Sequence, residues 1–389
     1  MAVLLPAPED PATHAPGAPP RTPYLVLDVA LALRRYADLA AALPGTRIHY
    51  AVKANPEPTL LARLVAAGSA FDVASPAEVA ACLAAGADTA DLVYSNPVTS
   101  RHDLVEAGAL GVRLFVADGE GQLTRLAAAV PGAQVLIRIA TSGHGSDWSL
   151  SRKYGCDPAD AVSLLASARR LGLGAAGVSF HVGSQQRDPA AWDAPIAQAA
   201  RIFAAARQRG LDPWLLDLGG GFPADLDGGP DQVTPRPAAY GAAIEAALGS
   251  HFPGRRPATL VEPGRGVVGD AGTLVASVIG LARRGGRRWV FLDAGVFTGL
   301  VETLDEAIRY RLETDRGGPL VPCVLAGPTC DSADVLYERT PAMLPRDLRE
   351  GDQVRLRAAG AYTTCYSTVG FNGFPPLATR LAPQPGRAR

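Results

Sequence analysis

Lysine is scarce in this chain, which narrows the search for a reactive amine to two side chains. Of the 37 basic residues only Lys53 and Lys153 are lysines. Lys53 follows the apolar run Tyr50-Ala51-Val52. An amine drawn out of water there is the uncharged nucleophile that Schiff-base chemistry requires. A lone lysine at the end of a strand is more often a surface charge, so this interpretation depends on the neighbours of Lys53.

A phosphate group is the ligand that a second set of residues could hold. Gly219-Gly220-Gly221 offers backbone N–H groups that no side chain obstructs, although a tight turn explains the glycines equally well. Arg265 would add a bidentate cation. Glu262 could pair with a protonated pyridine nitrogen, the interaction that makes pyridoxal phosphate an electron sink. The alternative for Glu262 is a buried ion pair with Arg265.

His181 and Ser184 follow another apolar run and extend this candidate site. The imidazole of His181 could lie flat against a cofactor ring, and the hydroxyl of Ser184 could donate to a phosphate. A structural histidine and a turn serine are the plainer alternatives. A metal site is not expected, because the sequence contains no HxxxH or CxxC spacing.

The carboxy-terminal part carries a thiol beside an acid, Cys330-Asp331. The thiol could return a proton to carbon, and the carboxylate could bind a substrate ammonium. An inert thiol and a turn-capping carboxylate are the plainer alternatives.

Repeated strand–helix units are predicted from about residue 28 onward, because short apolar runs alternate with longer Ala- and Leu-rich segments of helical period. Helices are expected at 31–42, 58–67, 77–85 and 190–208. Eight parallel strands with outer helices form a closed β/α barrel, and the runner-up is an open doubly wound sheet. The eight candidate strands are 47–52, 70–73, 91–94, 113–117, 134–139, 177–181, 214–218 and 259–262.

Polar residues at the carboxyl ends of these strands favour the barrel. In a barrel those ends converge on one face, whereas an open sheet spreads them along a row. The residues at or just beyond the strand ends are Lys53, Asp72, Asn96, Arg138, His181, Gly219 to Gly221, Glu262 and Arg265.

The pattern changes after residue 265 to β-rich runs separated by Gly/Pro turns. We therefore expect a β/α barrel at 23–265 and a mostly β domain at 266–380. Residues 23–28 form a leading strand that is a candidate to pair with the second domain. Segments 1–22 and 381–389 are expected to be flexible tails, and the proline-rich first segment does not resemble a signal peptide.

Composition restricts the class of partner. The 389 residues are 48% hydrophobic and 19% charged, with a formal net charge of -1. This balance gives no reason to expect nucleic acid or an anionic membrane, so a small-molecule substrate is expected. The five scattered cysteines fit reduced thiols in the cytoplasm.

The sequence also resembles a known family over residues 23–377. The motifs are YAVKANP at Tyr50, FDVAS at Phe71, DWSLSRKYGC at Asp147, FHVGSQQRD at Phe180, GGGFPA at Gly219, EPGR at Glu262, GPTCDSADVLYE at Gly327, GAYTT at Gly360 and FNGFPPL at Phe371. In this order they resemble the alanine-racemase-like (fold-type III) pyridoxal-phosphate decarboxylases, and most closely the bacterial ornithine/lysine decarboxylases.

The resemblance implies a role for each matching residue. Lys53 would carry the cofactor, His181 would stack on its ring and Glu262 would pair with its pyridine nitrogen. Family members are homodimers with shared sites, in which Cys330 would protonate carbon and Asp331 would bind the distal ammonium. The remaining cofactor-binding residues implied are Asp72, Arg138, Ser184, Gly219, Gly220, Gly221, Gly264, Arg265 and Tyr362, and the remaining substrate-binding residues are Glu302, Asp305 and Phe371.

Decarboxylation of L-ornithine to putrescine is the expected activity, with L-lysine to cadaverine as a second candidate. Residues 302–306 (Glu-Thr-Leu-Asp-Glu) replace the Tyr-Asp pair of eukaryotic ornithine decarboxylases, so the carboxylate that sets specificity is open. Cys330-Asp331-Ser332-Ala333 differs from the Cys-Glu-Ser-Gly of diaminopimelate decarboxylases. The alternatives are diaminopimelate, a substrate of specialised metabolism, and a catalytically silent homologue that binds a regulator.

Overall fold

The computed structural model of the protein describes residues 20–150, 152–226 and 234–383. Most of the two predicted tails, residues 1–19 and 384–389, lies outside these described residues. The chain divides into two compact units. One contains residues 29–225 and 234–269, and the other contains 20–28, 226 and 270–383.

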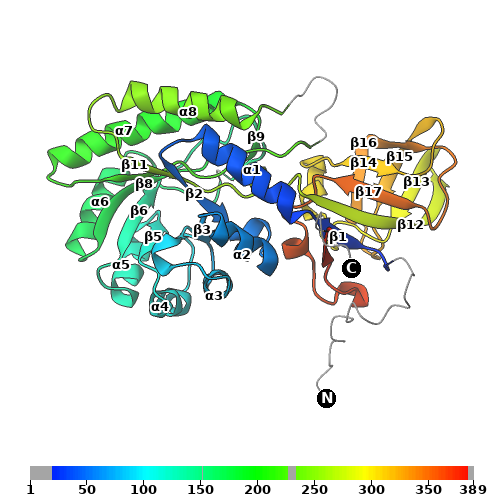
Figure 1. The fold of residues 1–389 in the computed structure, drawn as a ribbon, viewed down its shortest axis with the longest axis horizontal. Helices are drawn as coiled ribbons and strands as arrows, with labels where there is room; N and C mark the ends of the chain where they lie inside the picture. The colour runs from blue at the N-terminus through cyan, green and yellow to red at the C-terminus, as the bar shows by residue number, and fades with distance from the viewer. Residues whose placement is uncertain (1–19, 151, 227–233, 384–389) are drawn as a thin grey trace, which may run out of the picture. The chain divides into compact units, whose positions relative to one another are not determined.

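The first unit is built around a closed barrel of eight strands, each parallel to its neighbours (Figure 1). Its order is β10-β11-β2-β3-β4-β5-β6-β8, and β10 pairs with β8 to close the ring. The closed barrel predicted from the sequence is confirmed, and the open sheet is wrong. The strands are β2 (Thr46–Ala51), β3 (Ala70–Val73), β4 (Leu92–Tyr94), β5 (Leu114–Ala117), β6 (Gln134–Arg138), β8 (Gly174–Ser179), β10 (Leu215–Asp217) and β11 (Ala258–Val261).

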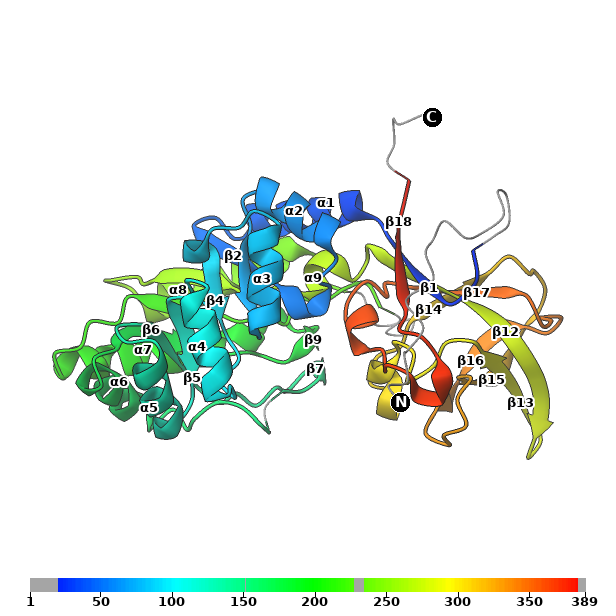
Figure 2. The same ribbon diagram turned by 90° about the horizontal axis from the view of Figure 1, so that it is seen from below.

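Helices lie around the outside of the barrel (Figures 1 and 2). Several begin at a capping residue, as at α3, where the hydroxyl of Ser75 accepts from the backbone N–H of Glu78 and Pro76 occupies the first turn. The helices are α1 (Val29–Ala42), α2 (Pro58–Ala66), α3 (Pro76–Ala84), α4 (Arg101–Ala109), α5 (Glu120–Ala129), α6 (Ala161–Arg170), α7 (Asp193–Gln208), α8 (Pro237–His251) and the short α9 (Arg265–Val268).

Buried apolar side chains fill the barrel and leave its polar residues at the strand ends. One layer consists of Val93, Val116, Leu136, Ala176, Leu215 and Leu260, each at most 5% exposed. Such layers make the barrel a packed core rather than a pore. A short antiparallel ribbon, β7 (Ser146–Trp148) with β9 (Ser184–Gln186), lies outside the ring.

The second unit is mostly β, as predicted. Its eight-stranded sheet runs β14-β17-β12-β13-β15-β16, and β1 pairs with both β12 and β18. A buried apolar cluster of this unit includes Leu274, Val290, Leu325, Tyr337 and Leu356. The strands are β1 (Tyr24–Leu27), β12 (Gly272–Arg284), β13 (Arg287–Leu292), β14 (Arg311–Thr314), β15 (Leu320–Ala326), β16 (Val335–Pro345), β17 (Gln353–Arg357) and β18 (Ala378–Leu381).

Within the described part of the chain, no helix has both the length and the apolar character needed to cross a bilayer. All five cysteines are free thiols.

Candidate active site

Lys53 forms an ion pair with a buried carboxylate. It lies in a single 3-10 turn (Val52–Ala54) that directly follows β2. Its Nζ donates to Oδ2 of Asp72 at 2.5 Å, and the side chain of Lys53 is 39% exposed whereas that of Asp72 is fully buried. From the sequence, apolar neighbours are expected to draw this amine out of water, and the family resemblance implies Asp72 as a residue of the same site. The structure places the Asp72 carboxylate beside the amine, on the neighbouring strand β3.

Ser95 holds the other oxygen of Asp72 and was not identified from the sequence. Its hydroxyl donates to Oδ1 of Asp72. The sequence analysis singled out the next residue, Asn96, but its amide donates to the carbonyl of Ala74 at 3.3 Å and its Oδ1 accepts from the N–H of Val98, as a turn residue does. The position of Ser95 just beyond β4 was a usable signal, because β3 and β4 are neighbours in the barrel.

Glu262 is a buried acid just beyond β11, and it is not the ion-pair partner of Arg265. The side chains of Glu262 and Arg265 form no salt bridge, so that alternative is wrong. Within the described structure, Oε1 of Glu262 has no hydrogen-bond partner. Burial raises the pKa of Glu262 well above its usual range, and the nearby carboxylate of Asp217 raises it further.

Asp217 is a second buried acid, and it interacts with Glu262. It was not identified from the sequence. It is fully buried at the end of β10, and its oxygens accept from the Ser179 hydroxyl and the Gly219 N–H, both at 2.8 Å. Burial raises the pKa of Asp217 to about 6. Its hydrogen bonds, including one with Glu262, lower the pKa and so oppose part of this effect. Two acids this close cannot both ionise cheaply, so a cation placed beside them would be stabilised.

His181 is a neutral imidazole at the carboxyl end of the barrel. Its Nδ1 accepts from the backbone N–H of Gly183 at 3.0 Å, so that nitrogen carries no proton. Burial lowers the pKa of His181 well below its usual value, and the charges of Arg138 and Lys53 lower it further. The imidazole also leaves no room for a side chain at position 220, because a Cβ at Gly220 would lie 2.9 Å from Nε2 of His181.

The three glycines allow the loop at 219–221 to pack closely against neighbouring backbone. Gly219 has a φ of +66°, and a Cβ there would lie 2.1 Å from the carbonyl oxygen of Phe180. Gly221 has a φ of +115°, a backbone conformation that residues with a side chain rarely adopt. A tight turn therefore accounts for these glycines. The N–H of Gly219 donates to Asp217, which leaves the N–H groups of Gly220 and Gly221 as the candidate phosphate donors.

Arg265 and Ser184 meet beside this loop. Arg265 begins α9 directly after Gly264 and is 3% exposed. Its Nε and Nη2 donate to Oγ of Ser184 at 3.4 and 3.3 Å. A buried guanidinium and a hydroxyl in contact are the donors that phosphate oxygens prefer.

Arg138 is partly buried at the end of β6 and supplies positive charge to the same region. Its guanidinium lies 4.9 Å from the centre of the Tyr154 ring. The same charge lowers the pKa values of His181 and Glu262. Apart from the turn residue Asn96, the barrel carries nine further predicted positions at or beyond its strand ends: Arg138, His181, Ser184, Gly219, Gly220, Gly221, Glu262, Gly264 and Arg265. No group of three or more His, Cys, Asp or Glu residues placed to hold a metal ion occurs in the described chain.

The other predicted site residues belong to the second unit. Cys330 is exposed, its Sγ accepts from the side-chain amide of Asn372 at 3.2 Å, and Asp331 caps a turn by accepting from the N–H of Ala333 at 2.8 Å. Tyr362 has a φ of +56°, and its ring lies 5.7 Å from that of Tyr366. The Phe371 ring lies 4.9 Å from the ring of Phe297.

The carboxylates of residues 302–306 differ sharply in exposure. Glu302 is 3% exposed, whereas the side chain of Asp305 is 94% exposed and pairs loosely with Arg339 at 3.4 Å. Glu306 accepts from the backbone N–H groups of residues 338, 339 and 340, which lowers its pKa despite partial burial. Glu306 therefore stabilises the local fold, and Asp305 is the carboxylate open to a ligand.

The site combines a closed β/α barrel with a lysine paired to a buried carboxylate, a buried acid that has an oxygen without a hydrogen-bond partner, and an arginine–serine pair. Together these features define a class of cofactor-dependent enzyme. Residues 30–269 match the sequence family of the pyridoxal binding domain of pyridoxal-dependent decarboxylases. The chain belongs to this family, and pyridoxal phosphate is its cofactor, as expected from the sequence.

Relatives of known activity are similar along nearly the whole chain. A lysine/ornithine decarboxylase of Selenomonas ruminantium is 37% identical over 354 residues, which are 91% of this chain and 88% of that protein. A lysine/ornithine decarboxylase of Vibrio vulnificus, solved with putrescine, is 34% identical with a TM-score of 0.81 and covers 93% of this chain and 94% of its own. Antizyme inhibitor 2 of Xenopus laevis is 32% identical, covering 91% of this chain and 79% of that protein.

Proposed function

We propose that this protein decarboxylates L-ornithine to putrescine, and that L-lysine, giving cadaverine, is its second substrate. Two relatives that act on lysine and ornithine support this substrate class. The observation that carries the decarboxylase chemistry is the buried Glu262, whose Oε1 has no partner in the described protein. That oxygen fits a protonated pyridine nitrogen, which is the group that the cofactor would present.

The residues present fit pyridoxal phosphate at each of its polar groups. Lys53 would hold the aldehyde carbon, supported by Asp72. The phosphate would bind Arg265, Ser184 and the glycine loop Gly219 to Gly221, where the N–H of Gly219 is already used by Asp217. Gly264 and Tyr362 are its further proposed ligands. When bound, the cofactor supplies an electron sink for the bond that breaks. Arg138 would add positive charge near the ring, as its effect on the pKa of His181 supports.

The protein's own residues would control the proton and the substrate chain. His181, whose Nδ1 carries no proton, would lie against the ring as a neutral group. It would add no positive charge that competes with the ring nitrogen for Glu262. Cys330 would return a proton to the substrate carbon after carbon dioxide leaves. Asp331 would bind the distal ammonium, with Asp305, Glu302 and Phe371 lining the far end of the substrate.

We also propose that two copies of the chain complete each site, with Cys330 and Asp331 supplied by the partner. We also propose a cytoplasmic location, because five free thiols suit a reducing compartment.

Arg265→Gln is expected to weaken binding of pyridoxal phosphate roughly 10- to 100-fold, because a charge-assisted hydrogen bond to phosphate is lost. The dissociation constant is measured by absorbance titration of cofactor-free protein. The matched control is Arg256→Gln, which removes an exposed arginine paired with Glu245 and is expected to leave affinity unchanged. Equal affinity in the wild type and Arg265→Gln would rule out Arg265 as a phosphate ligand.

Mixing two inactive variants tests the shared site. Lys53→Ala and Cys330→Ala homodimers are each expected to be nearly inactive. Coexpressed in equal amounts, about half of the dimers are mixed, and each mixed dimer has one intact site in two. The unseparated protein is expected to show about a quarter of wild-type activity, and the purified mixed dimer about half. The dimers are separated by distinct affinity tags and assayed individually. Purified mixed dimers without activity would show that each chain carries its own complete site.

Release of carbon dioxide and amine from purified protein with pyridoxal phosphate tests the substrate. We expect turnover of L-ornithine and L-lysine, and none of L-arginine or meso-diaminopimelate. Turnover of diaminopimelate instead would overturn the proposed substrate. A silent regulator-binding homologue is the second candidate, because antizyme inhibitor 2 is also similar. In that case no amino acid turns over although the cofactor binds.

A further inference from the structure

The hairpin that joins β12 to β13 concentrates positive charge. Four arginines flank a Gly285–Gly286 turn, whose φ values are +54° and +76°. Arg283 lies directly opposite Arg288, and Arg284 lies directly opposite Arg287. Like charges in directly opposed positions destabilise a pair of strands, so this hairpin requires compensation from elsewhere.

Two of these arginines are compensated by the protein. The guanidinium of Arg284 lies 5.8 Å from the Trp289 ring centre and 5.2 Å from that of Phe291. Arg287 donates to Oε1 of Glu338 at 3.2 Å. The pair formed by Arg283 and Arg288 has no such carboxylate or aromatic partner among the described residues.

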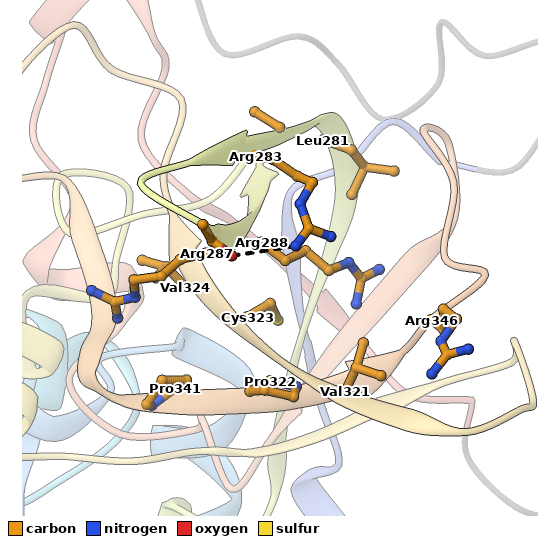
Figure 3. Close-up of a pocket in the computed structure, with 12 residues that line it drawn as sticks. Leu281, Arg283, Arg287, Arg288, Val321, Pro322, Cys323, Val324, Pro341 and Arg346 are labelled. Atoms are coloured by element: carbon orange, nitrogen blue, oxygen red, sulfur yellow. Dashed lines mark hydrogen bonds between the residues drawn. The ribbon is translucent and has the colours of Figure 1, made fainter.

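A pocket of about 780 Å³ lies beside this uncompensated pair (Figure 3). Four arginines line it: Arg283, Arg287, Arg288 and Arg346. Its other lining residues are apolar side chains, a glycine and the buried thiol of Cys323, with no Asp or Glu among them. All of them belong to the second unit, and none is among the site residues described above.

Three of the four arginines that line this pocket, Arg283, Arg288 and Arg346, have no carboxylate partner in the described chain. Arg288 donates to the carbonyl oxygens of Leu344 and Pro345 at 3.4 and 2.9 Å, which orients its guanidinium without cancelling its charge. Arg283 donates only to the carbonyl of Gly286, at 3.3 Å. Within the described chain, Arg346 has no carboxylate within 4.0 Å. Four cations face the pocket, and Glu338 on Arg287 is their one carboxylate partner in the described chain.

We propose that this pocket is a binding site for a small polyphosphate anion. Guanidinium groups bind phosphate oxygens through paired N–H donors, and a ligand with several phosphates in a chain could reach arginines spread along one pocket. The volume lies within the range of pockets that hold small ligands. The lining contains no aromatic ring on which a base could stack, so the phosphate chain is the part recognised.

Titration calorimetry of the cofactor-loaded enzyme with inorganic tripolyphosphate, at constant ionic strength, tests the proposal. We expect one site per chain and an unchanged cofactor absorbance spectrum. Arg283→Gln/Arg346→Gln is expected to lower affinity at least about 100-fold. Arg284→Gln is the matched control, because it removes the same charge from the same hairpin at a residue that does not line the pocket, and affinity should change less than about twofold.

Arg346→Gln alone, expected to lower affinity about tenfold, covers the case in which the double variant does not fold. No binding heat up to about 1 mM tripolyphosphate would overturn the proposal. An equal loss of affinity in Arg284→Gln would overturn it as well, since the ligand would then sense only net charge. Binding of polyglutamate without binding of tripolyphosphate would indicate an acidic protein partner instead.

Discussion

Lys53→Ala is expected to lower turnover of the amino-acid substrate by at least roughly 1,000-fold. The amine would be lost from the position that we propose for the cofactor's carbonyl carbon, and Asp72 would be left buried without its cation. Amine release is measured with saturating pyridoxal phosphate. This excludes the trivial explanation that the variant lacks cofactor.

The chain supplies an unusually clean control, because Lys153 is its only other lysine. Lys153 lies 5.2 Å from the ring centre of Tyr154, and we expect Lys153→Ala to retain most activity. Borohydride reduction of the wild type should attach the pyridoxyl group to the peptide that contains Lys53 and leave the Lys153 peptide unmodified. Attachment at Lys153, or full activity of Lys53→Ala, would disprove the assignment.

The barrel could be predicted because its pattern is local. Each strand is a short apolar run between turn residues, and the eight predicted strands overlap the eight strands of the closed ring. Boundaries differed by up to three residues, as at β8, which begins at Gly174 rather than at residue 177. Glycine and alanine are depleted in strands, so the composition of Gly174-Ala175-Ala176 does not mark it as the start of the strand.

The buried partners of the site could not be predicted in the same way. Ser95 and Asp72 are separated by 23 residues, and their contact exists only because β3 and β4 are neighbours. Asp217 and Glu262 meet because β10 and β11 pair. A single sequence shows which polar residues follow strands, but it does not show which of two adjacent residues, such as Ser95 and Asn96, points toward the site.

The specificity segment shows the same limit. Glu302, Asp305 and Glu306 are indistinguishable as carboxylates in the sequence. In the structure Glu302 is buried, Glu306 is bound by three backbone N–H groups, and Asp305 is exposed at a φ of +54°. Hydrogen bonds to residues distant in the sequence distinguish the structural acid Glu306 from the accessible acid Asp305. Such bonds leave no pattern in the local sequence.

Glu262→Gln is expected to lower kcat roughly 100- to 1,000-fold while the cofactor stays bound. The amide keeps the size of the carboxyl group but cannot become an anion beside a protonated ring nitrogen. Arg265 and Ser184 are unchanged, so the phosphate would still be held. Glu245→Gln, which changes an exposed acid of α8, is the matched control and should leave kcat unaltered.

The same substitution is expected to stabilise the cofactor-free protein at neutral pH. The pKa of Asp217 is raised to about 6 and that of Glu262 is also raised, so the folded protein binds more protons than the unfolded chain above pH 4. The stability of the wild type therefore falls as pH rises through this window and stays low above it. Glu262→Gln mimics the protonated acid and removes one of the two buried charges.

Thermal unfolding of cofactor-free wild type and Glu262→Gln at pH 4.5, 6.0 and 7.5 measures this effect. The variant is expected to melt several degrees higher at pH 7.5, which corresponds to about 1–3 kcal/mol, and the difference should shrink toward pH 4.5. Saturating pyridoxal phosphate should remove or reverse the difference, because its cation would neutralise Glu262 in the wild type. A variant that is less stable than the wild type at pH 7.5 without cofactor would show that Glu262 is already compensated by the protein, and its proposed role as partner of the ring nitrogen would lose its physical basis.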